Sequence, residues 1–148
     1  MDRIKLNDIQ PLSLEDLKFV LEVRNHISTR KWLKNNTKFT LKQTSNWFTS
    51  TNPNWFILLS RDVKDKRLGY IRTTIDGEIG CDIHPDYRRQ GLATKALSYM
   101  LDKKKFATLW VFEDNPAKKM YYRLGFKDTG NKTFIRDKKY VQMMYSAL

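Results

Sequence analysis

Residues 78–101, EIGCDIHPDYRRQGLATKALSYML, combine a predicted strand, a basic turn and a predicted amphipathic helix. A helix start presents unpaired N–H groups and the positive end of the helix dipole, so such a turn binds phosphate through its backbone. Gly91 lets a phosphate approach without a Cβ in the way, and Arg88 and Arg89 add positive charge. Because short glycine motifs recur by chance, a simple solvated turn is the other interpretation of this segment alone.

Two capping boxes mark helix starts in the first third of the chain. Ser13 is followed by Asp16, Thr40 is followed by Gln43, and apolar residues at helical spacing come after each pair. The elements expected here are a strand at 3–9 and helices at 13–24, 28–33 and 40–51.

From Trp55 onward the pattern changes to short apolar runs separated by turn residues. Asp76-Gly77 between two such runs is a strong hairpin signal, so we expect three consecutive antiparallel strands, the last ending at Pro85. The remaining expected elements are a helix from residue 91, a strand at 106–112, a helix at 115–124 that Gly125 ends, and strands at 126–136 and 139–145. This order predicts an α/β fold with a mixed sheet, in one domain covering residues 1–148.

The composition is that of a globular protein, with 41% hydrophobic residues in 148. No apolar run approaches the roughly 20 residues that cross a bilayer, and the N-terminus lacks the apolar region of a secretory signal. We therefore expect a cytoplasmic protein without a membrane partner. Cys81 is the only cysteine, and His26 and His84 are the only histidines, so we expect no disulfide and no metal site.

The chain is strongly basic, with 28 Lys and Arg residues against 16 Asp and Glu and a formal net charge of +12. This charge attracts anions by long-range steering but does not identify them. The basic residues lie in short groups without a basic tail, which favours a solvated surface over a specific nucleic-acid face.

Two segments resemble motifs of the GNAT superfamily of N-acetyltransferases. Residues 83–97, IHPDYRRQGLATKAL, are similar to its motif A, Gln/Arg-x-x-Gly-x-Gly/Ala, with Arg88, Gly91 and Ala93 in the three places. Residues 114–126, DNPAKKMYYRLGF, are similar to its motif B, in which Ala117, Met120, Tyr121, Leu124 and Gly125-Phe126 are in register. Asp114 stands where the family usually has Asn, and an alternative register puts Asn115 there.

The resemblance implies the GNAT fold, with a V-shaped opening between the fourth and fifth strands, and acetyl-CoA as acyl donor without a metal. The amine would attack the thioester carbonyl and expel the CoA thiolate. The main chain of Ile83 would pair with pantetheine. The implied cofactor-binding residues are Ile83, Arg88, Arg89, Gln90, Gly91, Leu92, Ala93, Thr94, Asp114 and Asn115.

Tyr121 matches the tyrosine that faces the cofactor sulfur in many members of the superfamily, which implies a general acid. A packed core aromatic is the alternative. With a reference pKa of about 10, a tyrosine is roughly 1.5 units weaker as an acid than a thiol, so full proton transfer would cost about 2 kcal/mol.

The general base is less defined by the pattern. Glu78, Asp82 and His84 alternate on one side of the predicted fourth strand, where they point together toward the acceptor or toward solvent. Glu78 is the candidate base. Without a conspicuous base, an amine of low pKa is favoured, and sugar amines and protein N-termini both qualify.

The N-terminal third resembles that of GNAT enzymes acting on nucleotide-linked amino sugars, of the pseudaminic-acid pathway type. The residues that carry this resemblance, and that would bind the substrate, are Arg24, Asn25, Arg30 and Trp32. Arginines pair with phosphates and tryptophan stacks on a base or sugar, while a core Trp with exposed arginines is the alternative. The expected partner is a small-molecule amine, and the expected protein is a monomer or homodimer.

Two other functions stay open at this point. Ribosomal-protein N-terminal acetyltransferases share a related entry segment, so a protein N-terminus is the alternative acceptor. A GNAT-fold module that binds CoA without catalysis is the alternative from another class.

Overall fold

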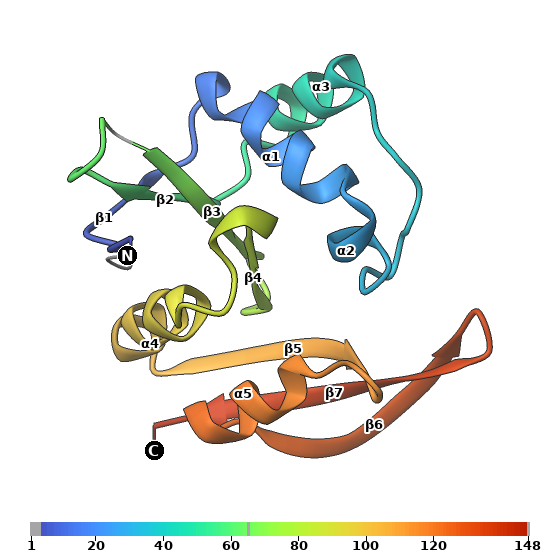
Figure 1. Cartoon of the computed structure of the whole chain (residues 1–148). Helices are drawn as coiled ribbons and strands as arrows, with labels where there is room; N and C mark the ends of the chain where they lie inside the picture. Colours follow the sequence, from blue (N-terminus) through green and yellow to red (C-terminus); the bar gives the residue numbers. More distant parts are fainter. Residues whose placement is uncertain (1–3, 65, 148) are drawn as a thin grey trace.

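The computed structural model describes residues 4–64 and 66–147 as two antiparallel sheets with helices packed on them (Figure 1). The first sheet has the strand order β1-β2-β3-β4 and the second the order β5-β7-β6. The strands are β1 (Asp8–Pro11), β2 (Phe56–Ser60), β3 (Lys66–Thr73), β4 (Ile79–Ile83), β5 (Phe106–Phe112), β6 (Lys127–Ile135) and β7 (Lys138–Ser146). The helices are η1 (Leu14–Asp16), α1 (Leu17–Asn25), α2 (Ile27–Arg30), α3 (Leu41–Thr51), η2 (Pro85–Tyr87), α4 (Leu92–Lys104) and α5 (Ala117–Leu124).

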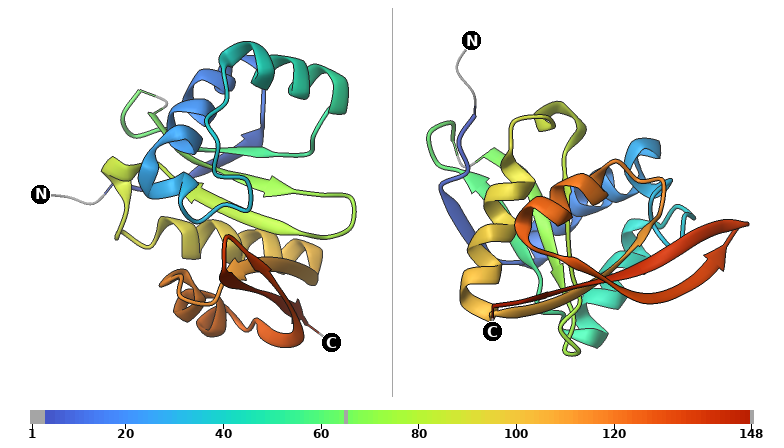
Figure 2. Two further views of the ribbon diagram at one scale, coloured as in Figure 1. Left: turned by 90° about the vertical axis from the view of Figure 1, so that its right-hand side faces the viewer. Right: turned by 90° about the horizontal axis from the view of Figure 1, so that it is seen from below.

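The first sheet separates two hydrophobic cores, because successive side chains of a strand point to opposite faces. Ile57 and Tyr70 pack with residues of α1 on one face, where α1 also contacts α3. Leu58 and Ile71 lie on the other face and pack with Leu97 of α4 and with the second sheet. Helix α4 therefore lies between the sheets, while the β6–β7 hairpin extends away from the body (Figure 2).

Local signals in the sequence predicted most elements correctly. The Thr40 hydroxyl accepts the Gln43 N–H at 3.1 Å, and the Gln43 side chain accepts the Thr40 N–H at 2.8 Å, so this capping box begins α3 as expected. Ser13 and Asp16 form the other box. The hairpin, the strand at 106–112 and the helix from Gly91 are also confirmed.

The predicted first strand at 3–9 is confirmed at Asp8 and Ile9 and is wrong at residues 4–7, which are not in a strand; Arg3 lies outside the described residues. Strand β1 begins at Asp8 and pairs with β2 through Pro11. Upstream, the Ile4 N–H donates to Gln90 Oε1 at 3.1 Å and Lys95 Nζ donates to Leu6 O at 2.8 Å. These side chains, remote in sequence, bind the backbone that the apolar pattern assigned to a sheet.

The inner face of α4 supplies a stability test. Leu97 retains 1% of its surface, so Leu97→Ala is expected to lower the free energy of unfolding by about 2–5 kcal/mol through lost burial and a residual cavity. Leu14, which is 58% exposed, is the matched control, and Leu14→Ala should change it by about 0.5 kcal/mol or less. Urea unfolding measures both, and equal losses would contradict this packing.

Candidate active site

Strands β4 and β5 meet at one end only. The Thr108 N–H donates to Gly77 O at 3.0 Å, beside a single parallel bridge between Glu78 and Thr108. Within the described residues no further pairing joins the two strands. The sheets therefore diverge from this point, as the predicted V-shaped opening requires.

The register of β4 decides which peptide groups face the opening. Glu78 O accepts from Thr74 N–H and His84 N–H donates to Leu68 O, so the even-numbered residues of this segment bond to β3. Residues in an antiparallel pair alternate in this respect, so the peptide groups of Cys81 and Ile83 point away from β3. They point into the gap between β4 and β5.

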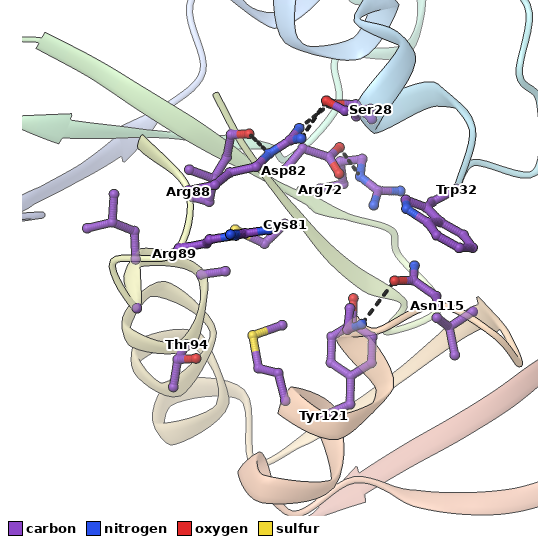
Figure 3. A pocket seen from close by; sticks show the side chains of 18 of the residues that line it. Ser28, Trp32, Arg72, Cys81, Asp82, Arg88, Arg89, Thr94, Asn115 and Tyr121 are labelled. Carbon is purple, nitrogen blue, oxygen red and sulfur yellow. Dashed lines mark hydrogen bonds and ion pairs between the residues drawn. The ribbon is translucent and has the colours of Figure 1, made fainter. Parts of the chain in front are cut away.

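A cavity of about 460 Å³ occupies this opening (Figure 3). It extends from the turn before α4 across β4 and β5 to α5 and α2. Of the predicted cofactor-binding residues, those that line it are Ile83, Arg88, Arg89, Gly91, Leu92, Ala93, Thr94 and Asn115. Residues 30 or more apart in sequence thus meet in one cavity.

The turn at 88–91 has the backbone of an anion-binding site. Gly91 has a φ of 77° and Arg89 one of 63°, both in the left-handed region, which glycine adopts without strain. Lys95 N–H donates to Gly91 O as the first bond of α4. The preceding N–H groups, from residues 92–94, therefore have no partner within the helix and lie along the cavity at the positive end of its dipole.

Two residues of this turn have other contacts. The Arg88 guanidinium donates to Ile83 O at 3.0 Å, to Thr29 Oγ1 at 2.6 Å and to Ser28 Oγ, and burial lowers its pKa. Gln90 bonds to Ile4 N–H and does not line this cavity. Arg88 thus connects the turn to α2.

Asn115, rather than Asp114, lines the cavity. Its Oδ1 accepts the Ala117 N–H at 2.9 Å at the start of α5, although the N-cap of this helix is Pro116 and not Asn115 as predicted. Asp114 instead lies 3.3 Å from Lys138 Nζ on an exposed surface. The geometry therefore favours the alternative register of motif B at this one position.

A second cavity, of about 380 Å³, shares three lining residues with the first, Arg72, Trp110 and Tyr121. Glu78 lies on its wall at the base of β4, and Lys34 lies on its wall in the segment after α2. Tyr121 points from α5 toward the junction (Figure 3). The candidate acid and the candidate base thus line one cavity.

Tyr121 is a weaker acid than its reference value suggests. Burial raises its pKa to about 12, with further contributions from Asp82 and Cys81, and these outweigh the opposing effect of Arg72. Burial also raises the pKa of the Cys81 thiol. Both groups therefore stay protonated at neutral pH.

Arg72 at the junction is a residue that the sequence analysis missed. It lies opposite Gly80 in the register, and a Cβ at position 80 would overlap its guanidinium. Its Nε lies 3.0 Å from Asp82 Oδ2, an ion pair without the alignment of a hydrogen bond. Burial alone would lower the pKa of Arg72, but Asp82 outweighs it and the pKa is raised. The sequence held one signal that could have identified it, a charged residue within the predicted strand segment YIRTT at 70–74.

The three residues predicted to alternate on β4 diverge in their contacts. Glu78 precedes the strand and lines the second cavity, and Asp82 pairs with Arg72. His84 Nε2 lies 3.1 Å from Glu22 Oε1, and its ring stacks on Phe19 at 5.8 Å. Of the three, Glu78 alone lines the second cavity.

The residues expected to bind an acceptor hold the loop after α2 with their polar groups. The Arg24 guanidinium donates to Asn35 O at 2.7 Å and to Thr37 O at 3.0 Å, and its carbon lies 4.3 Å from the Phe39 ring centre. Burial lowers the pKa of Arg24. Asn25 bonds to both backbone groups of Phe39, at 2.8 and 3.0 Å.

Arg30 acts in the same way, donating to Asn25 O at 3.0 Å and to Asn36 O at 3.2 Å. Trp32 is the member of the set that lines the first cavity (Figure 3). The role of these four residues toward an acceptor stays a prediction.

The β6–β7 hairpin reaches this loop from the far end of the chain. The Arg136 guanidinium donates to Leu33 O at 2.9 Å and to Lys34 O at 2.8 Å. Lys138 Nζ lies 5.5 Å from the Trp32 ring centre. The hairpin and the loop are thereby joined beside both cavities.

In the part of the chain that the structure describes, no helix is long and apolar enough to cross a membrane. The same residues include no group of three or more His, Cys, Asp or Glu that could hold a metal ion.

Comparison with known families gives a match over most of the chain. Residues 20–126 match the model of the acetyltransferase (GNAT) family. Comparison with the curated proteins gave no match.

Solved structures share the fold at low sequence identity. Spermidine N-acetyltransferase from Vibrio cholerae, in complex with CoA and spermine, is 17% identical with a TM-score of 0.83 and 93% of each chain covered. A GNAT-family acetyltransferase from Bacillus anthracis is 18% identical, with a TM-score of 0.75 and 97% of each chain covered. Ribosomal-protein-alanine N-acetyltransferase from Brucella melitensis is 16% identical, with a TM-score of 0.76, covering 95% of this chain and 99% of that one. These similarities confirm the expected fold.

Asn25→Ala tests whether Asn25 holds the loop. Loss of both bonds to Phe39 is expected to lower the free energy of unfolding by about 1–3 kcal/mol and to speed amide exchange at Phe39 at least tenfold. Asn36→Ala is the control, because the structure uses only the backbone carbonyl of Asn36. If Asn25 served acceptor binding alone, exchange would be unchanged and only the KM for the acceptor would rise.

Proposed function

This chain belongs to the acetyltransferase (GNAT) family, and from that premise we propose that it transfers an acetyl group from acetyl-CoA to a primary amine of a small molecule. The observation that carries the proposal is the position of Tyr121 where two cavities meet. One cavity borders the turn before α4, and the other has the carboxylate of Glu78 on its wall. A donor and an acceptor could thus meet at Tyr121 from opposite sides.

The first cavity fits acetyl-CoA, which supplies an acetyl group activated as a thioester. Backbone N–H groups of residues 92–94 would bind the pyrophosphate, and Arg89 and Arg123 on the cavity wall would add positive charge. The other two arginines on this wall have contacts of their own: Arg88 bonds to Thr29 and Arg72 pairs with Asp82. The peptide groups of Cys81 and the N–H of Ile83, which face the gap, would pair with the amides of pantetheine, while Ile83 O accepts from Arg88.

Gly91→Ala tests the phosphate turn. Gly91 has a φ of 77°, and the position that a Cβ would occupy is open. Alanine there strains the backbone and adds a methyl group at the turn. We expect the Kd for acetyl-CoA, measured by calorimetry, to rise about tenfold.

Gly130→Ala is the matched control, since Gly130 has a φ of 91° and equally open surroundings in β6. Gly130→Ala should lower the free energy of unfolding by about as much as Gly91→Ala does, while the Kd for acetyl-CoA stays unchanged. The same Kd in both variants and the parent protein would contradict the proposal that this turn binds the phosphates of acetyl-CoA.

In the proposed reaction the amine nitrogen forms a bond to the thioester carbon, the C–S bond breaks, and its electron pair leaves with sulfur. Glu78 accepts a proton from the amine, directly or through water. Cys81 stays a thiol because burial raises its pKa, which supports direct transfer rather than an acyl-cysteine.

Tyr121 acts mainly as a hydrogen-bond donor to the departing sulfur. Because its pKa is about 12, full transfer of its proton to a thiolate of pKa about 8.5 would cost on the order of 5 kcal/mol, more than the reference value implies. A donated hydrogen bond stabilises the developing charge without that cost.

The acceptor we favour is an amine of low pKa, such as the amine of a nucleotide-linked amino sugar. A lysine-like amine near pKa 10.4 must lose a proton about 3 units above neutral pH, at a cost of about 4–5 kcal/mol, whereas an amine near pKa 8 loses it readily. Trp32 offers a ring on which a base or sugar could stack. A CoA-binding module without catalysis would leave the second cavity and Glu78 without a function.

Tyr121→Phe is expected to lower kcat at least tenfold and to leave the affinity for acetyl-CoA nearly unchanged, because only the hydroxyl is lost. Tyr122→Phe is the control, because Tyr122 is exposed and its hydroxyl donates to Asp128 at 2.6 Å. Initial rates of CoA release across an amine panel measure both. An unchanged kcat in Tyr121→Phe would reduce Tyr121 to a packing residue.

A further inference from the structure

We infer that the acceptor carries an anionic group close to its amine, and that Lys34 together with Arg72 binds this group. The inference rests on the proposed function, because it concerns the acceptor of that reaction. It narrows the class of acceptor to amines that also carry a carboxylate or phosphate, which includes amino acids, amino-sugar phosphates and nucleotide-linked amino sugars.

The charges on the wall of the second cavity come from Lys34, Arg72 and Glu78. Arg72 is paired with Asp82. Within the described part of the chain, neither Lys34 nor Glu78 forms an ion pair. The cavity thus offers one uncompensated carboxylate and one uncompensated ammonium, which together complement a zwitterion.

Arg72 has donors left for an anion. Its contact with Asp82 is made through Nε, and the side chain keeps 36% of its surface. Its terminal nitrogens form no hydrogen bond with the described residues, and the side chain lies over Gly80 on the wall of the second cavity. A planar guanidinium with two free nitrogens is suited to bidentate binding of a carboxylate or phosphate.

Lys34 is held at the cavity by its backbone. Arg136 donates to the carbonyl oxygens of Leu33 and Lys34, and Arg30 donates to that of Asn36. The ammonium therefore extends from an anchored segment, so less freedom is lost when it binds an anion.

A polyamine fits this cavity poorly. It would bring two or more ammonium groups to a wall with a single uncompensated carboxylate, and Lys34 and Arg72 would repel them. The net charge of +12 also repels polycations and attracts anions at long range. The similarity to spermidine N-acetyltransferase from Vibrio cholerae, at 17% identity, is one of fold and does not identify the acceptor of this chain.

The test compares matched amines that differ by one anionic group. The pairs are glucosamine with glucosamine 6-phosphate, and glycylglycinamide with glycylglycine, and spermidine serves as the polycation. Binding is measured by calorimetry with CoA present at saturation, so that no turnover is needed. We expect the anionic member of at least one pair to bind at least tenfold more tightly than its partner, and more tightly than spermidine.

Lys34→Glu should remove that preference, and Lys34→Met should reduce it about threefold or more. Lys38→Glu is the matched control, because Lys38 lies in the same loop, lines neither cavity and gives the same change in net charge. It should keep the preference. Because Lys34 is exposed, we expect each variant to fold, and thermal unfolding checks this.

Equal binding within both pairs, no binding by either anionic amine, tighter binding of spermidine, or a preference that survives in Lys34→Glu would overturn the inference. Failure of the parent protein to bind CoA would instead overturn the proposed function.

Discussion

The divergence of β4 from β5 is the constraint on which the rest of the structure depends. Backbone bonding at a single bridge, which includes the bond from Thr108 N–H to Gly77 O, joins the two sheets near the start of these strands. Beyond it the edge of β4 is left with the peptide groups of Cys81 and Ile83 unpaired by strand β5. Buried backbone groups need partners, so such an edge offers a ligand backbone groups that a continuous sheet would already pair. The turn before α4 and the start of α5 both lie beside it.

A second consequence of the divergence is the junction of the cavities at Tyr121 and Arg72. Burial makes Tyr121 a poor acid, while the pairing of Arg72 with Asp82 keeps the guanidinium charged in the same place. Gly80 leaves room for the guanidinium, which a Cβ at position 80 would displace from its present position. The site therefore favours hydrogen-bond donation and charge complementarity over proton transfer from the tyrosine.

In the N-terminal third, polar side chains that were predicted to bind a ligand instead stabilise the loop after α2. Arg24, Asn25 and Arg30 bond to backbone groups between residues 35 and 39, where a long loop without regular structure would otherwise leave carbonyls unsatisfied. By fixing this loop they present Trp32 to one cavity and Lys34 to the other. Any effect of these residues on an acceptor would therefore act through the loop that they hold.

Much of this protein could be predicted from sequence because the signals are local. Helix starts follow from side chains three residues apart, as at Thr40 and Gln43, and the left-handed turn before α4 follows from one glycine before an amphipathic helix. Two motifs at the correct spacing were sufficient for the family. The tertiary structure alone decided the contacts of Arg88 with α2, the choice of Asn115 over Asp114, the first strand's start at Asp8, and the meeting of Arg72, Lys34 and Glu78 in one cavity. Each of these depends on groups distant in the chain, or on a burial that no short segment encodes. The raised pKa of Tyr121 has the same origin, because desolvation is a property of the packed molecule.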